Sequence, residues 1–138
     1  MKRHEVITKY REAITAAMIE CYRAVVESDG RIMSHLYIWE DGEVETLEAP
    51  QGDAGWLKAR DAEPRKLFPV TDIEEPAGFS IWDYSEHGEP EDPADRETLR
   101  AEIIDYLMES YTDTVPDRLG YIIQEAEEEA AYDDGYYF

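Results

Sequence analysis

The chain has 138 residues, of which 34 are acidic and 13 are basic, so its formal net charge is −21. This length predicts a single domain, residues 1–138, that is large enough to fold without a metal or a disulfide. The charge argues against direct nucleic-acid binding and against docking on an anionic membrane, because phosphate groups would be repelled.

The aromatic and cysteine content predicts a folded protein that resides in a reducing compartment. The chain holds 10 Tyr, 3 Trp and 3 Phe, whereas disordered acidic tails lack aromatic residues. Cys21 is the one cysteine, which excludes an internal disulfide and favours a cytoplasmic location. No signal-peptide core follows Met1, and no apolar run approaches the roughly 18 residues of a membrane span.

The first element is predicted to be an amphipathic helix over residues 5–27. Apolar side chains recur there at steps of three and four, which is typical of a helix with one buried face. Ser28, Asp29 and Gly30 follow and predict its end, because glycine readily adopts the left-handed conformation of a helix C-terminus.

Residues 31–49 predict a β-hairpin. Asp41-Gly42 is a strong signal for a two-residue turn, and with this turn at the centre Trp39 would pair with Val44. The first strand is apolar on both faces and is predicted to be central. The second carries Glu and Thr on its flank, as edge strands often do.

The middle of the chain, residues 50–78, is punctuated by proline and glycine. Residues 66–70 are compatible with a short edge strand, since Pro69 argues against a central one. Residues 79–84 alternate in a way that predicts a further strand.

Two helices are predicted after this region. Asp92 is expected to cap the first, which runs to about Tyr111, and a break over residues 112–115 leads to Pro116 and a last helix over about 116–132. The inward side chains predicted for the first helix are Leu99, Ile103, Tyr106, Leu107 and Ser110.

The predicted fold class is therefore α+β. A small antiparallel sheet, made of the hairpin 31–49 plus one or two further strands, would be packed by the N-terminal helix and the two C-terminal helices.

Residues that could carry chemistry are scattered. His4, His35 and His87 lie in three different segments, and no two of them share a metal-ligand spacing on one element. Cys21 falls on the apolar stripe of the first helix and is expected in the core. No phosphate-binding glycine loop is present, and carboxylates are too abundant to indicate acid–base catalysis. We therefore expect no metal, no cofactor and no enzymatic activity.

The C-terminal helices carry an unusual density of acids. Neighbouring carboxylates on one helix face lie about 5–6 Å apart and destabilise the helix when no base relieves them. Only Arg96, Arg100 and Arg118 are available for relief in this part of the chain. The candidate partner-binding residues are Glu102, Asp105, Glu109, Asp117, Glu125, Glu128, Glu129 and Asp133.

The leading hypothesis is a decoy that occupies a basic nucleic-acid-binding groove on another protein. Small inhibitors made by phages and mobile elements against CRISPR effectors or restriction enzymes have a comparable size and charge, although no residue motif is shared. Charge would speed the encounter, and the aromatic side chains of Tyr132 and residues 136–138 would supply a hot spot.

Other hypotheses remain open at this point. One is that the acids form only a solvated surface or an adaptation to high salt. An acidic chaperone or immunity protein would shield a basic client through Trp39 or Trp82 as well as through its helices. A small-ligand binder or enzyme would need a pocket near Trp56 and Trp82. The sequence does not determine the partner or the oligomeric state.

Overall fold

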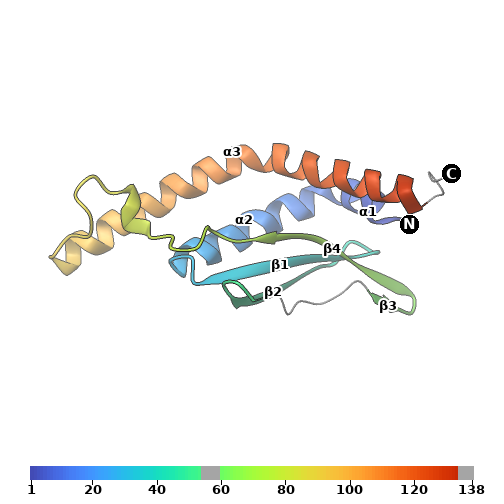
Figure 1. Cartoon of the computed structure of the whole chain (residues 1–138), viewed down its shortest axis with the longest axis horizontal. Coiled ribbons are helices and arrows are strands. Elements are labelled where there is room, and N and C mark those ends of the chain that lie inside the picture. Colours follow the sequence, from blue (N-terminus) through green and yellow to red (C-terminus); the bar gives the residue numbers. More distant parts are fainter. Residues whose placement is uncertain (54–59, 134–138) are drawn as a thin grey trace.

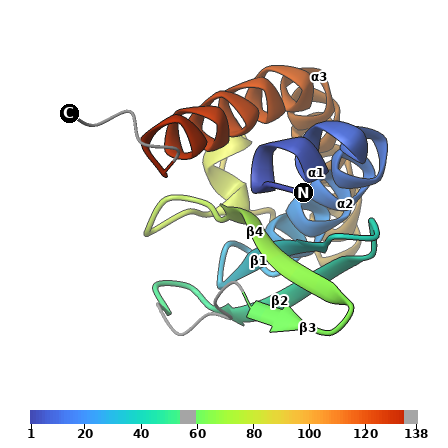
Figure 2. The same cartoon turned by 90° about the vertical axis from the view of Figure 1, so that its right-hand side faces the viewer.

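The computed structural model describes residues 1–53 and 60–133. Its elements are α1 (Arg3–Lys9), α2 (Arg11–Glu27), β1 (Ile32–Trp39), β2 (Val44–Pro50), β3 (Arg60–Ala62), β4 (Arg65–Ile73), the 3₁₀ helix η1 (Ile81–Tyr84) and α3 (Pro93–Asp133). The strands form one antiparallel sheet in the order β2-β1-β4-β3. The three α-helices cover one face of this sheet (Figure 1), and the end-on view shows the resulting two layers (Figure 2). The α+β prediction is confirmed.

The N-terminal helix is divided at Tyr10, so the prediction of one helix over 5–27 is wrong in this detail. Tyr10 ends α1 and begins α2 with a non-helical backbone (φ −110°, ψ 30°). Its ring packs against Gly42 of the hairpin turn, where a Cβ atom would come within 2.5 Å of it. The predicted apolar stripe is nevertheless retained, because Val6 and Ile14 are fully buried on the two sides of the break.

The hairpin is present, but its register differs by one residue from the prediction. Val44 pairs with Ile38 and not with Trp39. The backbone N–H of Trp39 donates to the carbonyl of Glu43, and the N–H of Gly42 donates to the carbonyl of Trp39, both at 2.8 Å. Gly42 has a φ of +97°. This geometry is that of a three-residue loop with a left-handed glycine, which needs one residue more than the predicted turn.

The central position of β1 and the edge position of β2 are confirmed. The short strand predicted over 66–70 is part of a longer one, because β4 runs over nine residues. β3 pairs with β4 only at its start, so around Pro69 the strand lies at the edge of the sheet, as expected. Pro69 pairs with Tyr37 immediately after a slip in the β1–β4 register, and β3 reaches only as far as Leu67. Proline is tolerated at such a place because its missing N–H interrupts no regular ladder.

The predicted strand over 79–84 is also wrong, because Ile81–Tyr84 form η1. The hydroxyl oxygen of Ser80 accepts a hydrogen bond from the N–H of Trp82 at 3.3 Å, which caps this short helix. Ile81 is buried against Val26 of α2 and the first half of α3. Six residues were too few for period-two and helical patterns to be told apart.

The start of α3 is confirmed. The Asp92 carboxylate accepts a hydrogen bond from the Ala94 N–H at 2.8 Å, and Pro93 occupies the first helical position. The predicted break over 112–115 is wrong, so one continuous helix of 41 residues replaces the two expected C-terminal helices.

Pro116 lies inside α3, where it removes one main-chain hydrogen bond and bends the helix near its middle (Figure 1). Packing outweighs this loss. Tyr111, just before the predicted break, and Val115, its last residue, are both buried in the main core with α1 and α2.

Six buried side chains of α3 follow steps of four residues. These side chains are Ile103, Leu107, Tyr111, Val115, Leu119 and Ile123. The first two pack with Val26 and Ile81, and the other four join the core formed with α1, α2 and the sheet. Tyr106 and Ser110 were predicted to point inward and are exposed, so that part of the prediction is wrong.

Candidate functional site

The acidic residues predicted to bind a partner are all on α3. Glu102, Asp105, Glu109, Asp117, Glu125, Glu128 and Glu129 are exposed. Asp133 is the last residue of the helix, and its side chain lies outside the described part.

Six exposed acids follow steps of four along this helix, which we call the acidic ridge. Its members are Asp105, Glu109, Asp113, Asp117, Glu125 and Glu129. Each step advances about 6 Å along the helix. The ridge is offset by two residues from the row of buried side chains that begins at Ile103, which corresponds to a rotation of about 200° around the helix axis. Asp113 was missed from the sequence because it fell in the predicted break. Tyr121 occupies the one step that lacks a carboxylate.

Most of the ridge is not neutralised. Glu129 pairs with Arg3 at 3.0 Å. With the side chains described in residues 1–53 and 62–132, the other five ridge carboxylates make no ion pair within 4.0 Å. Like charges at four-residue spacing destabilise a helix by about 0.2–0.5 kcal/mol per pair. The ridge is therefore held in place by packing on the other side of α3.

Tyrosines are exposed on and beside the same helix. The exposed fractions are 62% for Tyr106, 70% for Tyr121, 58% for Tyr132 and 49% for Tyr84. The rings of Tyr84 and Tyr106 lie 6.5 Å apart between centroids. Tyr132, one of the aromatic residues predicted as a possible hot spot, is exposed. The other hot-spot candidates, residues 136–138, and Trp56 of the predicted ligand pocket fall outside the described residues.

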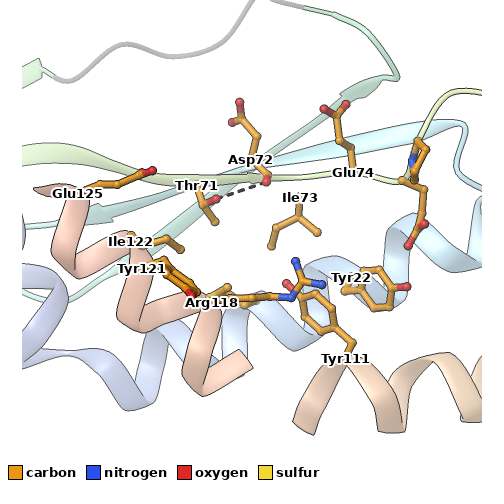
Figure 3. Close-up of a pocket in the computed structure, with 13 residues that line it drawn as sticks. Tyr22, Thr71, Asp72, Ile73, Glu74, Tyr111, Arg118, Tyr121, Ile122 and Glu125 are labelled. Atoms are coloured by element: carbon orange, nitrogen blue, oxygen red, sulfur yellow. Dashed lines mark hydrogen bonds between the residues drawn. The ribbon is translucent and has the colours of Figure 1, made fainter. Parts of the chain in front are cut away.

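A cavity of about 550 Å³ lies between α2, α3 and the end of β4 (Figure 3). Tyr22 and Tyr111 stack within it, with ring centroids 4.0 Å apart, and the Arg118 guanidinium lies 5.0 Å from the Tyr111 centroid. Burial raises the pKa of Tyr111 to about 12. Burial and a hydrogen bond with Glu75 raise the pKa of Tyr22. Both phenols are therefore neutral at physiological pH.

The acids around this cavity point in different directions. Figure 3 shows the carboxylate of Glu125 directed toward Thr71 across the cavity, and those of Asp72 and Glu74 turned away from the stacked rings. Asp72 instead lies 2.7 Å from Nδ1 of His35, which is fully buried in β1. The cavity thus brings together aromatic rings, one guanidinium and carboxylates, without an arrangement that identifies a reaction.

The described residues form neither a metal site nor a reactive thiol site. Among the side chains that the structure describes, in residues 1–53 and 62–132, no three His, Cys, Asp or Glu converge as metal ligands. Cys21 is buried in α2, and burial raises the pKa of its thiol, so that it is held in the unreactive protonated form.

Comparison with known proteins adds no relative: no family model, curated protein sequence or solved structure matches this chain. Within the described part, no helix combines the length and apolar character needed to cross a membrane. The function must therefore be argued from the surface of α3.

Proposed function

We propose that this protein binds a basic partner protein through the acidic ridge and blocks its nucleic-acid-binding surface. The observation that carries the proposal is the ridge itself, in which five of six carboxylates are exposed and lack an ion pair within the described residues. A basic groove would supply the missing counter-charges. We place this activity in the cytoplasm, in keeping with the single cysteine.

The position of the ridge supports a binding role over mere solvation. Scattered acids on an exposed helix would satisfy solubility. Here they are aligned at about 6 Å intervals, with a cost in helix stability and with exposed tyrosines beside them. Aromatic residues are enriched at protein interfaces and their hot spots.

Shielding of a client through the sheet is less well supported. Trp39 is only 6% exposed, and the Arg65 guanidinium covers its ring at 4.2 Å from the centroid. Trp82 packs against the cluster formed by Val26 and Ile81. Neither tryptophan offers the free apolar surface that a client-shielding chaperone would use.

The test is capture of partners from the host lysate on the tagged protein at low salt, followed by a salt gradient and by competition with DNA or RNA. A ridge variant would neutralise four acids, Asp105→Asn, Glu109→Gln, Asp113→Asn and Asp117→Asn. If each exposed ion pair contributes about 0.5 kcal/mol, affinity for the captured protein falls about 30-fold.

A matched control removes the same number of charges from exposed acids outside α3. It carries Glu12→Gln, Glu20→Gln, Glu86→Gln and Glu91→Gln. We expect the control to bind within about twofold of the natural protein, because screening weakens the effect of distant charges. Binding that is insensitive to salt and to nucleic acid, or that is lost equally in both variants, would show that the ridge is not the binding surface.

A further inference from the structure

The described part of the chain contains a guanidinium site of its own. Arg65 lies over the Trp39 ring, with 4.2 Å between the guanidinium carbon and the ring centroid. The same guanidinium pairs with Asp41 at 3.3 Å and with Glu43. In this protein an aromatic face and two carboxylates therefore contact one arginine side chain together.

Exposed positions of α3 repeat these components twice without an arginine, once around Tyr106 and once around Tyr121, which lies at the mouth of the cavity between α2, α3 and β4. Tyr106 is flanked by Glu102, four residues before it, and by Glu109, three residues after it. Residues at these spacings are neighbours on a helix surface, with about 5–6 Å between their Cβ atoms. The Tyr106 ring thus has one carboxylate about one helical turn before it and another about one turn after it.

The second set is centred on Tyr121. Asp117 lies four residues before this tyrosine and Glu125 four residues after it. Arg118 is close in sequence but is engaged elsewhere: its Nε donates to the Thr114 hydroxyl at 3.0 Å, and its guanidinium is directed to the Tyr111 ring (Figure 3).

Both sets are accessible. The tyrosine rings are 62% and 70% exposed. Within the described part of the chain, Glu102, Glu109, Asp117 and Glu125 form no ion pair within 4.0 Å. Each set therefore has the aromatic face and the negative charges that hold Arg65, and both are open to a side chain from another molecule.

We propose that α3 recognises arginine side chains of its partner specifically, with one guanidinium stacking on Tyr106 and another on Tyr121. The flanking carboxylates would accept hydrogen bonds from each guanidinium. Arginine suits such sites better than lysine, because its planar, weakly hydrated group stacks on rings while it binds carboxylates. The inference rests on the proposed function and adds to it a preference that charge alone cannot produce.

The experiment compares two peptides of equal length and charge, an arginine–glycine repeat and a lysine–glycine repeat, by calorimetric titration at moderate salt. Two exposed cation–π contacts predict that the arginine peptide binds about fivefold to tenfold more tightly. Tyr106→Leu combined with Tyr121→Leu should reduce this preference below about twofold, with little change for the lysine peptide. Tyr106→Phe combined with Tyr121→Phe should retain it, because the ring faces remain.

The outcomes separate the inference from the proposed function. Equal affinity for the two peptides, or a preference that survives the leucine substitutions, would overturn arginine recognition and leave charge-based binding intact. Failure of both peptides to bind would count against the acidic ridge as a binding surface, and with it against both proposals. Because both rings are largely exposed, the substitutions are expected to leave the fold unchanged, which circular dichroism verifies.

Discussion

Neutralising the middle of the acidic ridge should make the protein more stable. Glu109→Gln combined with Asp113→Asn removes all three four-residue repulsions between Asp105 and Asp117. At about 0.2–0.5 kcal/mol for each pair, the free energy of unfolding should rise by about 1 kcal/mol. For a domain of this size the melting temperature would increase by about 3–5 °C.

The assay is urea unfolding followed by circular dichroism, with the slope against urea held common to all variants. The control combines Glu20→Gln and Glu97→Gln, two exposed acids that are each followed three residues later by an arginine, Arg23 and Arg100. It removes the same charge but relieves no such repulsion within its helix, so no gain is expected.

Salt provides a second check. In about 1 M NaCl the Debye length falls to about 3 Å, below the spacing of the ridge carboxylates, so most of the gain should disappear. A loss of stability in the ridge variant, or an equal gain in the control, would refute the view that the ridge is a destabilising surface retained for binding.

Two further predictions concern the contacts that hold α3 and the core. Arg3 donates to the carbonyls of Pro69 at 2.7 Å and Val70 at 3.2 Å, and it also pairs with exposed Glu129. In urea titrations, Arg3→Met should therefore lower the free energy of unfolding by about 2–3 kcal/mol, and Glu129→Gln by less than about 0.5 kcal/mol. Equal losses in the two variants would contradict the view that the carbonyl contacts, and not the ion pair, stabilise the fold. The pKa of Tyr111 is raised from about 10 to about 12 in the folded protein, so the neutral phenol contributes fully to stability below pH 10 and loses this contribution as the pH approaches 12. In thermal melts between pH 10 and pH 12, Tyr111→Phe should therefore lose less stability than the natural protein. Parallel losses in the two proteins would count against a raised pKa for Tyr111.

Features that depend on local chemistry were predictable from the sequence. Asp92 followed by Pro93 located the start of α3, because a carboxylate cap and a proline in the first turn favour a helix N-terminus. The apolar faces of β1 located the centre of the sheet. In each case, residues close in sequence supply most of the physical cause.

The errors arose where distant contacts decide the structure. Pro116 is a helix breaker in isolation, but the burial of Tyr111 and Val115 against α1 and α2 maintains the helix through it. Tyr106 was predicted to face the core because it lies three residues after Ile103, a step that one face of a helix allows. Six of the buried side chains of α3 follow steps of four, which rotate about 40° per step around the helix, and Tyr106 lies outside that path.

The acid-rich faces could be found from composition and spacing, but their geometry could not. Splitting α3 into two helices hid Asp113 and therefore the continuity of the ridge. No local signal indicates that the chain remains helical there, because the stabilising contacts come from α1 and α2, far away in the sequence.

The continuity of α3 determines what the ridge can imitate. From Asp105 to Glu129 it spans about 36 Å, close to one turn of a DNA duplex. Its charges are sparse, however, at about one per 6 Å compared with about one per 1.7 Å of duplex. Charge alone would therefore leave the protein a weak competitor for a groove that binds DNA. The exposed rings of Tyr106 and Tyr121 offer guanidinium contacts that phosphates do not, and in our proposal these contacts compensate for the missing charge.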